Sequence, residues 1–466
     1  MKAFMDEKFL LHTDTAVELY NHIKDLPIID YHCHLDPAAI ANNSTFRSIT
    51  DLWLGGDHYK WRLMRHNGVP ESHITGDASD KEKFVAFCTT IEKCIGNPVY
   101  HWAHLEMRTY FGYDGVITAA KAEELYDLCN SYVQKDDFTV HNLLKNSHVE
   151  WLATTDDPAD SLEHHIKIKK DNTPGVPKVL PSYRPSNALD LDKPTFGAYM
   201  GRLGEATGVT ITDWATLTEA LENSVEHFHQ VGCKSSDHAL DPPVFNTEST
   251  PQTAEAAFKK ALKGEALTPC EISAYKTQVM LFLGGAYAKR DWVMQLHMCA
   301  QRSNNTKMLK QLGPDTGFDS MSDASFSLPL NLLLDAMETK GQLPRTVLYS
   351  LNPNADDMLV TTTGNFAGQG IKGRMQWGSA WWFNDTKTGM EKHLITLANN
   401  GMIANFIGML TDSRSFISYP RHEYFRRIIA NQLGKWVEDG EFPKDMDLLC
   451  KIAADIAYNN VREYFS

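Results

Sequence analysis

The stretch LPIIDYHCHLDP, residues 26–37, decides the fold. Its apolar start predicts a short buried strand, and the chain then turns at Asp36-Pro37. Alternate side chains of a strand share a face, so His32 and His34 point one way while Cys33 points the other. Two imidazoles at the end of a buried strand suit a divalent metal ion, but two ligands are too few to hold one. A third ligand must come from another part of the chain.

Seven later stretches repeat the pattern of a short apolar strand that ends in polar residues, and helical periodicity fills the intervals, as in residues 331–341 and 390–401. Strand alternating with helix predicts parallel pairing, and eight such units close a TIM barrel with its active site at the C-terminal strand ends. A doubly wound open sheet is the alternative, although no G-x-G-x-x-G turn follows the first strand. The eight predicted strands are residues 27–35, 149–158, 177–186, 231–240, 292–301, 345–353, 373–381 and 403–416.

Two intervals between strands are too long for a single crossover helix, and both contain helical patterns. We therefore predict an α/β chain with an N-terminal helix in residues 1–26 and a distorted (β/α)8 barrel in residues 27–438. Helical insertions over the barrel mouth are predicted at about residues 37–148 and 241–291. A C-terminal helical segment is predicted in residues 439–466.

Composition narrows the class of protein. The formal net charge of -14 argues against a nucleic-acid partner and against an anionic membrane surface. No stretch has the uninterrupted apolar length needed to cross a bilayer, and the N-terminus does not read as a signal peptide. Eight cysteines without a C-x-x-C pair predict reduced thiols, so we expect a cytoplasmic protein.

Barrel closure supplies a candidate for the third metal ligand. The eighth strand lies beside the first in such a barrel, and the stretch MLTDSRSF brings Asp412 to its end, with Arg414 on the same strand face. His32, His34 and Asp412 could then meet around one metal ion. The sixth strand, TVLYSLNP, has no histidine for a second metal ion, so we expect a mononuclear site.

Five stretches together resemble the uronate isomerases of the amidohydrolase superfamily: DYHCHL, DHYKWRLMRHNG, PSYRP, WWFND and GMLTDSRSFISYPRHEYFRR. The resemblance implies a distorted TIM barrel, one divalent metal ion, most often Zn²⁺, and an aldose to ketose reaction on hexuronates. The implied reactions convert D-glucuronate to D-fructuronate and D-galacturonate to D-tagaturonate.

The resemblance also implies a set of site residues. Asp412, or water held on the metal beside it, is the candidate proton shuttle, and Tyr59 or His58 would polarise or protonate a sugar oxygen. The guanidinium groups of Arg184 and Arg414 fit the substrate carboxylate. The arginines of RHEYFRR are expected to form salt bridges. The expected metal ligands are His32, His34 and Asp412; the catalytic residues Asp412, Arg414, Tyr59, His58 and His297; the substrate-binding residues Arg184, Arg414 and Trp381.

Some assignments stay open at this point. His297, at the end of the fifth strand, is either a metal ligand or a core histidine hydrogen-bonded near the site, and Trp381 is either a sugar-facing wall or a core aromatic. Asp237-His238 ends the fourth strand and could support the ligands from behind. The rival functions are a mononuclear amidohydrolase acting on a small acidic amide or ester and a non-catalytic barrel that binds sugar acids. The apolar helical exterior predicts a homo-oligomer.

Overall fold

Parallel strands form the frame of the molecule, and seven of the eight predicted stretches contain one or more of them. The structure is a computed structural model that describes residues 3–368 and 370–466. Hydrogen bonds join the strands into sheets of order β1-β2-β3 and β10-β9-β6-β5-β4, and every pair within them is parallel. These strands are β1 (Ile28–Asp30), β2 (Val149–Ala153), β3 (Lys178–Leu180), β4 (Ser182–Tyr183), β5 (Ser235–Leu240), β6 (Val293–Met298), β9 (Arg345–Ser350) and β10 (Met375–Trp377).

The two sheets are continuous through the backbone between β2 and β4. The amide of Asp156 donates to the carbonyl of Ser182 (2.9 Å), and the amide of Arg184 donates to the carbonyl of Asp156 (2.9 Å). The strands therefore run from β1 to β10 in chain order. Chain-order parallel pairing is the topology of an α/β barrel, whereas a doubly wound sheet reverses its strand order. The predicted barrel class is confirmed.

The eighth predicted strand, residues 403–416, is wrong as a regular strand. It begins as the 3-10 helix η5 (Ile403–Asn405) and continues as extended chain without a ladder. Gly408 and Asp412 have positive φ angles of 75° and 48°, which interrupt a pleated strand. The Asp30 carboxylate also accepts a hydrogen bond from the Thr411 amide (2.8 Å), which would otherwise be free to pair with a neighbouring strand. The segment still lies beside the first strand, because the His34 amide donates to the Ser413 carbonyl (2.9 Å).

Amphipathic helices cross over between the strands. Three of them begin at capping boxes, Asp213 with Thr216 for α12, Thr250 with Thr253 for α13 and Thr268 with Glu271 for α14, which satisfy the first free amides of each helix. The crossover helices are α9 (Glu163–Asp171), α10 (Ser186–Leu189), α11 (Phe196–Thr207), α12 (Trp214–Val231), α13 (Pro251–Leu262), α14 (Pro269–Lys289), α15 (Thr306–Leu312), α16 (Ser327–Glu338), α17 (Asp356–Asn365) and α18 (Lys387–Asn400).

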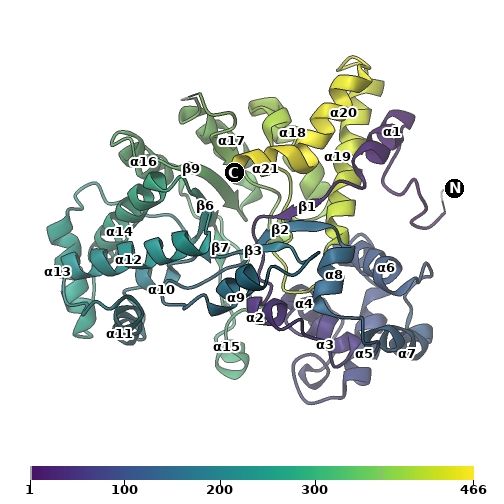
Figure 1. Cartoon of the computed structure of the whole chain (residues 1–466), viewed down its shortest axis with the longest axis horizontal. Coiled ribbons are helices and arrows are strands. Elements are labelled where there is room, and N and C mark those ends of the chain that lie inside the picture. The colour runs from purple at the N-terminus through teal and green to yellow at the C-terminus, as the bar shows by residue number, and fades with distance from the viewer. Residues whose placement is uncertain (1–2, 369) are drawn as a thin grey trace.

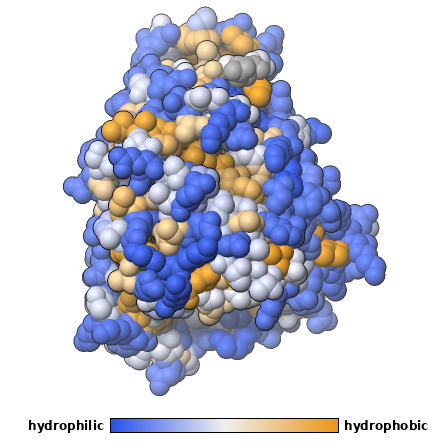
Figure 2. Space-filling model, turned by 90° about the vertical axis from the view of Figure 1, so that its left-hand side faces the viewer, coloured by the Kyte–Doolittle hydropathy of each residue, from blue (hydrophilic) through white to orange (hydrophobic). Residues whose placement is uncertain are grey.

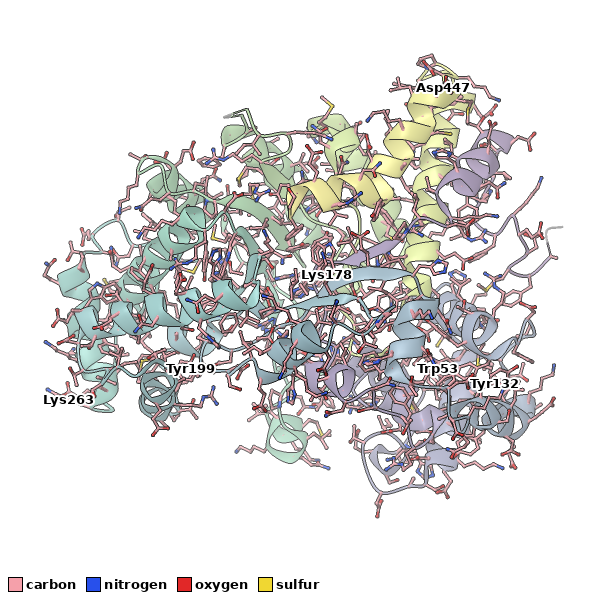
Figure 3. All side chains as sticks on the ribbon, viewed as in Figure 1. Trp53, Tyr132, Lys178, Tyr199, Lys263 and Asp447 are labelled. Carbon is pink, nitrogen blue, oxygen red and sulfur yellow. The ribbon has the colours of Figure 1, made fainter. Side chains whose placement is uncertain are left out.

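The predicted insertion at residues 37–148 is helical, and Figure 1 shows its helices gathered on one side of the strands, opposite α11 to α14. Figure 3 places Trp53 and Tyr132 in this group, and Tyr199 and Lys263 in the other. The group comprises α2 (Pro37–Ala41), α3 (Ile49–Leu54), α4 (His58–His66), α5 (Asp80–Ile91), α6 (Pro98–Phe111), α7 (Ala122–Val133) and α8 (Val140–Asn146).

The chain ends pack together on the outside of the frame. Helix α1 (Asp14–Ile23) contacts α19 (Pro420–Glu438) and α20 (Met446–Ala454) along the upper right of Figure 1. The chain closes with α21 (Asn460–Tyr464). The remaining short elements are the hairpin β7 (Ala300–Gln301) with β8 (Ser320–Met321), the 3-10 helices η1 (Glu71–His73), η2 (Ala119–Lys121), η3 (Pro353–Ala355) and η4 (Trp382–Asn384), and the π-helix η6 (Asp455–Asn459).

The outer surface is mostly polar. On the face that carries α13, hydrophilic residues predominate and hydrophobic ones form small separate groups (Figure 2). No helix in the described part of the chain has the length and apolar character that a membrane span requires.

The barrel interior below the mouth is closed by a hydrogen-bonded layer. The Tyr349 hydroxyl donates to the side-chain oxygen of Gln295 (2.9 Å), and Nε2 of Gln295 donates to the backbone carbonyl of Tyr31 (3.4 Å). The Tyr31 hydroxyl in turn donates to the backbone carbonyl of Gly408 (3.0 Å). These buried side chains link β1, β6, β9 and the irregular eighth segment. This layer forms a fixed floor for the residues at the strand ends above it.

Candidate metal centre and active site

Three predicted metal ligands meet at the C-terminal ends of the first and last barrel segments. The Nε2 atoms of His32 and His34 lie 3.3 and 3.1 Å from Oδ1 of Asp412. Backbone hydrogen bonds hold the histidine segment on both sides, from the Cys33 amide to the Ala153 carbonyl and from the His34 amide to the Ser413 carbonyl, both 2.9 Å. Two imidazoles and one carboxylate, with ligand atoms within 4.8 Å of one another, are a donor set for a divalent metal ion.

Asp412 is fixed in an unusual backbone conformation by its neighbours. The Asp30 carboxylate accepts the Thr411 amide (2.8 Å) and hydroxyl (2.6 Å), while the Arg421 guanidinium donates to the Thr411 carbonyl (3.1 Å). These contacts support the positive φ of Asp412, which is strained for a residue with a side chain. Burial acts to raise the pKa of Asp412, but hydrogen bonds from His32 and His34 hold it well below the ordinary value. The group is therefore an anion at neutral pH.

The second oxygen of Asp412 contacts Trp381. The indole Nε1 donates to Oδ2 at 2.9 Å, and the ring centroid lies 4.7 Å from that of His297. Trp381 is 5% exposed, so it is a buried aromatic whose polar edge faces the site. It orients the carboxylate by using the oxygen that the histidines leave free.

His297 lies beside the three ligands. Its Nδ1 is 2.7 Å from Oδ1 of Asp237, and its ring centroid is 4.7 Å from that of His32. Because the carboxylate accepts at Nδ1, the neutral imidazole has its lone pair on Nε2, which is buried without a hydrogen-bond partner among the described residues. Burial lowers the pKa of His297, although Asp237 opposes this, so the ring is neutral. A bare buried imidazole nitrogen fits a metal ligand, and a carboxylate behind it is the usual partner of such a ligand.

Asp237 joins His297 to Arg184. The Arg184 guanidinium is 2.6 Å from Oδ2 of this fully buried carboxylate. Burial acts to raise the pKa of Asp237, but Arg184 and then His297 hold it well below the ordinary value. Arg184 lines a cavity with Asp241 and Arg302. Its predicted contact with the substrate carboxylate stays a prediction, and its charge is already compensated by Asp237.

His58, Tyr59, Asp412 and Arg414 line one cavity together. His58 and Tyr59 are the first residues of α4, and Asp57 caps this helix by accepting the amides of Tyr59 (3.0 Å) and Lys60 (3.1 Å). The two rings stack with centroids 4.9 Å apart. Burial and the charge of Arg414 lower the pKa of His58, so its imidazole is neutral. Burial and the charge of Asp412 raise the pKa of Tyr59 well above its ordinary value, so its hydroxyl stays protonated.

The loop between β7 and β8 anchors α4. Arg62 donates to the carbonyls of Gly317 (3.2 Å) and Asp319 (2.7 Å), and Arg65 donates to the carbonyl of Thr316 and pairs with Glu71. The helix that carries His58 and Tyr59 is thereby tied to the segment between β7 and β8.

Three functional residues have weaker signals in the sequence. Asp237 stands at a predicted strand end, but its link to both Arg184 and His297 depends on strand register. Asp30 lies inside the apolar strand and looks like a core position. Arg421 belongs to a segment whose arginines were expected to form salt bridges, whereas it hydrogen-bonds to Thr411 and lines the cavity next to Asp412.

The parallel barrel and the histidine and aspartate group at its strand ends define a metal-binding α/β barrel enzyme. The family model for glucuronate isomerase matches residues 1–465. The chain belongs to this family of uronate isomerases.

Relatives support this assignment along the whole chain. It is 51% identical to the uronate isomerase of Caldanaerobacter subterraneus subsp. tengcongensis over 465 residues, covering 100% of this chain and 99% of that protein. It is 50% identical to that of Clostridium acetobutylicum over 466 residues, with coverage of 100% and 99%.

Solved structures agree. The uronate isomerase of Thermotoga maritima superposes with a TM-score of 0.94 at 36% identity, covering 100% of both chains. The glucuronate isomerase of Caulobacter crescentus superposes with a TM-score of 0.91 at 26% identity, covering 99% of this chain and 97% of that one.

Proposed function

We propose that this isomerase interconverts D-glucuronate with D-fructuronate and D-galacturonate with D-tagaturonate, with one Zn²⁺ ion held by His32, His34 and Asp412. The observation that carries the proposal is the convergence of these three ligands beside a cavity lined by Arg414, His58 and Tyr59. The printed names of the relatives supply the uronate substrate class.

The reaction moves a carbonyl group from C1 to C2 of an open-chain sugar acid. A proton leaves C2, negative charge develops on the neighbouring oxygens, the proton of the C2 hydroxyl passes to the C1 oxygen, and a proton is delivered to C1. Groups fixed at those oxygens in advance stabilise the charge more than they stabilise the substrate. A divalent ion, when bound, supplies positive charge for these oxygens.

The protein side chains divide the remaining work. Asp412 is the anionic group nearest the candidate metal centre, and Trp381 and the histidines fix both of its oxygens, so it is our candidate for moving the proton between C2 and C1. The Tyr59 hydroxyl stays protonated and can donate a hydrogen bond to a sugar oxygen. The neutral His58 imidazole stacks on the same tyrosine and limits its movement.

The site must also attract an anion to a protein whose formal net charge is -14. Arg414 is exposed at the cavity and supplies local positive charge for the substrate carboxylate. The free thiols of the eight cysteines support a place in the reducing cytoplasm, which is part of the same proposal.

The decisive experiment follows ketose formation by NMR after the zinc-loaded protein is mixed with D-glucuronate or D-galacturonate in deuterated water. We expect both ketoses to form, dialysis against a chelator to abolish turnover, and stoichiometric zinc to restore it. Uronate binding without ketose formation by the zinc-loaded protein would contradict the proposal. Hydrolysis of a small acidic amide with glucuronate left unchanged would favour the amidohydrolase instead.

A further inference from the structure

A buried lysine lies at the start of the helix that carries His58 and Tyr59. Lys60, on α4, is 2% exposed, although an ammonium group usually stays in water because its burial is costly. Its Nζ atom lies 3.1 Å from Oδ2 of Asp57 and donates to the Trp53 carbonyl at 3.1 Å. The mechanism above gives this buried cation no role.

Lys60 holds the carboxylate that caps α4. Oδ1 of Asp57 accepts the amides of Tyr59 (3.0 Å) and Lys60 (3.1 Å), while Oδ2 is the oxygen that pairs with the lysine. Burial acts to raise the pKa of Asp57, but Lys60 and then Arg421 hold it below the ordinary value, so the cap is an anion. One carboxylate thus fixes the backbone of Tyr59 and is itself held by the charge of Lys60.

Helix α6 contacts the same region through two residues that are one helical turn apart. Glu106 accepts the indole N–H of Trp53, and its carboxylate lies 3.7 Å from Nζ of Lys60. Four residues earlier, the Trp102 ring packs edge to face with the Tyr59 ring at a centroid distance of 6.4 Å. Residues i and i+4 share one face of a helix, so the same face of α6 contacts Tyr59 and the lysine that holds its helix cap.

The turn between α3 and α4 forms part of the cavity wall. Residues 55–57 line the cavity together with Tyr59 and Arg414. A Cβ atom at Gly56 would lie 3.6 Å from Cδ of Arg414, so the turn packs against that side chain. A shift of this turn therefore moves Tyr59 within the site, whereas the predicted metal ligands lie on other segments of the chain.

We propose that Lys60 is a positioning residue for the isomerisation, which through Asp57 holds the Tyr59 hydroxyl at the sugar oxygen. This inference rests on the function proposed above. Lys60 is not among the residues that line the cavity, so it acts through the start of α4 and not by contact with the sugar. A displacement of about 1 Å from the productive geometry can lower a rate about 100-fold, so a small loosening of the turn is measurable.

A purely structural role of Lys60 predicts a different result. If the ammonium group only stabilises the fold, its loss lowers the melting temperature and leaves kcat unchanged wherever the protein is still folded. If it positions Tyr59, its loss lowers the kcat of the folded protein, and the size of this effect depends on the Tyr59 hydroxyl. A double-mutant cycle between the two residues separates these cases.

The experiment measures kcat and KM for D-glucuronate, zinc content and melting temperature on zinc-loaded protein. The variants are Lys60→Met, Tyr59→Phe and the double variant Tyr59→Phe/Lys60→Met, in which methionine replaces the charged side chain by an uncharged, unbranched one. The matched control is Arg374→Met, which removes a buried cation that pairs with Glu338 (2.7 Å) and does not line the Asp412 cavity.

We expect Lys60→Met to lower kcat about tenfold, with KM changed less than about threefold and zinc content unchanged. In the Tyr59→Phe background the same substitution should change kcat less than about twofold, because the hydroxyl that it displaces is already gone. Arg374→Met should lose thermal stability but keep the wild-type kcat.

A wild-type kcat in Lys60→Met overturns the inference, and so does a loss that persists in full in the Tyr59→Phe background, because losses at independent sites multiply. If Lys60→Met does not fold, the double substitution Asp57→Asn/Lys60→Met replaces it in the same cycle. It leaves no unpaired carboxylate at residue 57, and asparagine caps helices as well as aspartate does. A wild-type protein that forms no ketose refutes the proposed function, whereas ketose formation with an unaffected Lys60→Met variant refutes only this inference.

Discussion

Replacing Asp237 by asparagine tests how the site is held together. This carboxylate is fully buried and lies 2.6 Å from the Arg184 guanidinium and 2.7 Å from Nδ1 of His297. Asparagine keeps the shape of the side chain but removes its charge. Its NH2 group then faces either Arg184 or His297, both of which are hydrogen-bond donors. Breaking a buried ion pair costs about 3–5 kcal/mol, and the partial exposure of Arg184 (25%) reduces this to about 2–3 kcal/mol. Turnover should fall about 10- to 100-fold, since His297 loses the partner that orients it.

Urea unfolding followed by circular dichroism measures the stability change, and ketose formation measures the turnover of Asp237→Asn. The matched control is Asp190→Asn, because Asp190 makes a longer ion pair with Lys276 (3.6 Å) and its side chain is 38% exposed. The control should unfold and turn over like the wild type. If Asp237→Asn keeps both wild-type stability and wild-type turnover, the buried link between Arg184 and His297 does not support the site.

Three further changes test other parts of the site and the fold. His32→Ala should lose both bound zinc, measured by elemental analysis, and turnover; full zinc occupancy would show that His32 is not a ligand. Trp381→Phe removes the donor to Asp412 (2.9 Å) and should lower kcat about tenfold with little change in zinc content, so a wild-type kcat would contradict its orienting role. Burial raises the pKa of Asp156 to about 7 in the folded protein. Between pH 4 and 7 the folded chain then binds more protons than the unfolded chain, and the unfolding free energy falls as pH rises. Asp156→Asn removes this contribution, so the unfolding free energy of the variant should rise relative to that of the wild type as the pH increases from 4 to 7. A difference in unfolding free energy that stays constant over this range would disprove the raised pKa of Asp156.

Much of the frame could be predicted from the sequence because its strands are apolar runs with polar ends. Seven of the eight predicted stretches contain strands in the expected order. The prediction of an eighth strand was wrong because the Asp30 carboxylate accepts the Thr411 amide that a neighbouring strand would bind. In addition, Gly408 and Asp412 adopt positive φ angles. Neither event leaves a periodic signal in the sequence.

The meeting of His32, His34 and Asp412 followed from barrel closure and was visible in advance. The residues that lie behind this group, Asp237 and Arg421, could not be predicted in the same way. Asp237 reaches His297 through the register of β5 against β6, in which Ala239 lies opposite His297. Arg421 reaches the cavity through the rotation of α19 about its axis, which amphipathic patterning does not define when nearly every face of the first turns is buried.

The candidate metal centre joins residues near the two ends of the polypeptide, His32 and His34 before the large insertion and Asp412 just before α19. During synthesis the two histidines emerge long before the aspartate, so a nascent chain has only two of the three ion-binding groups. Tight metal binding therefore requires that the segment with Asp412 has docked beside the first strand. The bound ion then stabilises the folded full-length chain but not a chain truncated before Asp412.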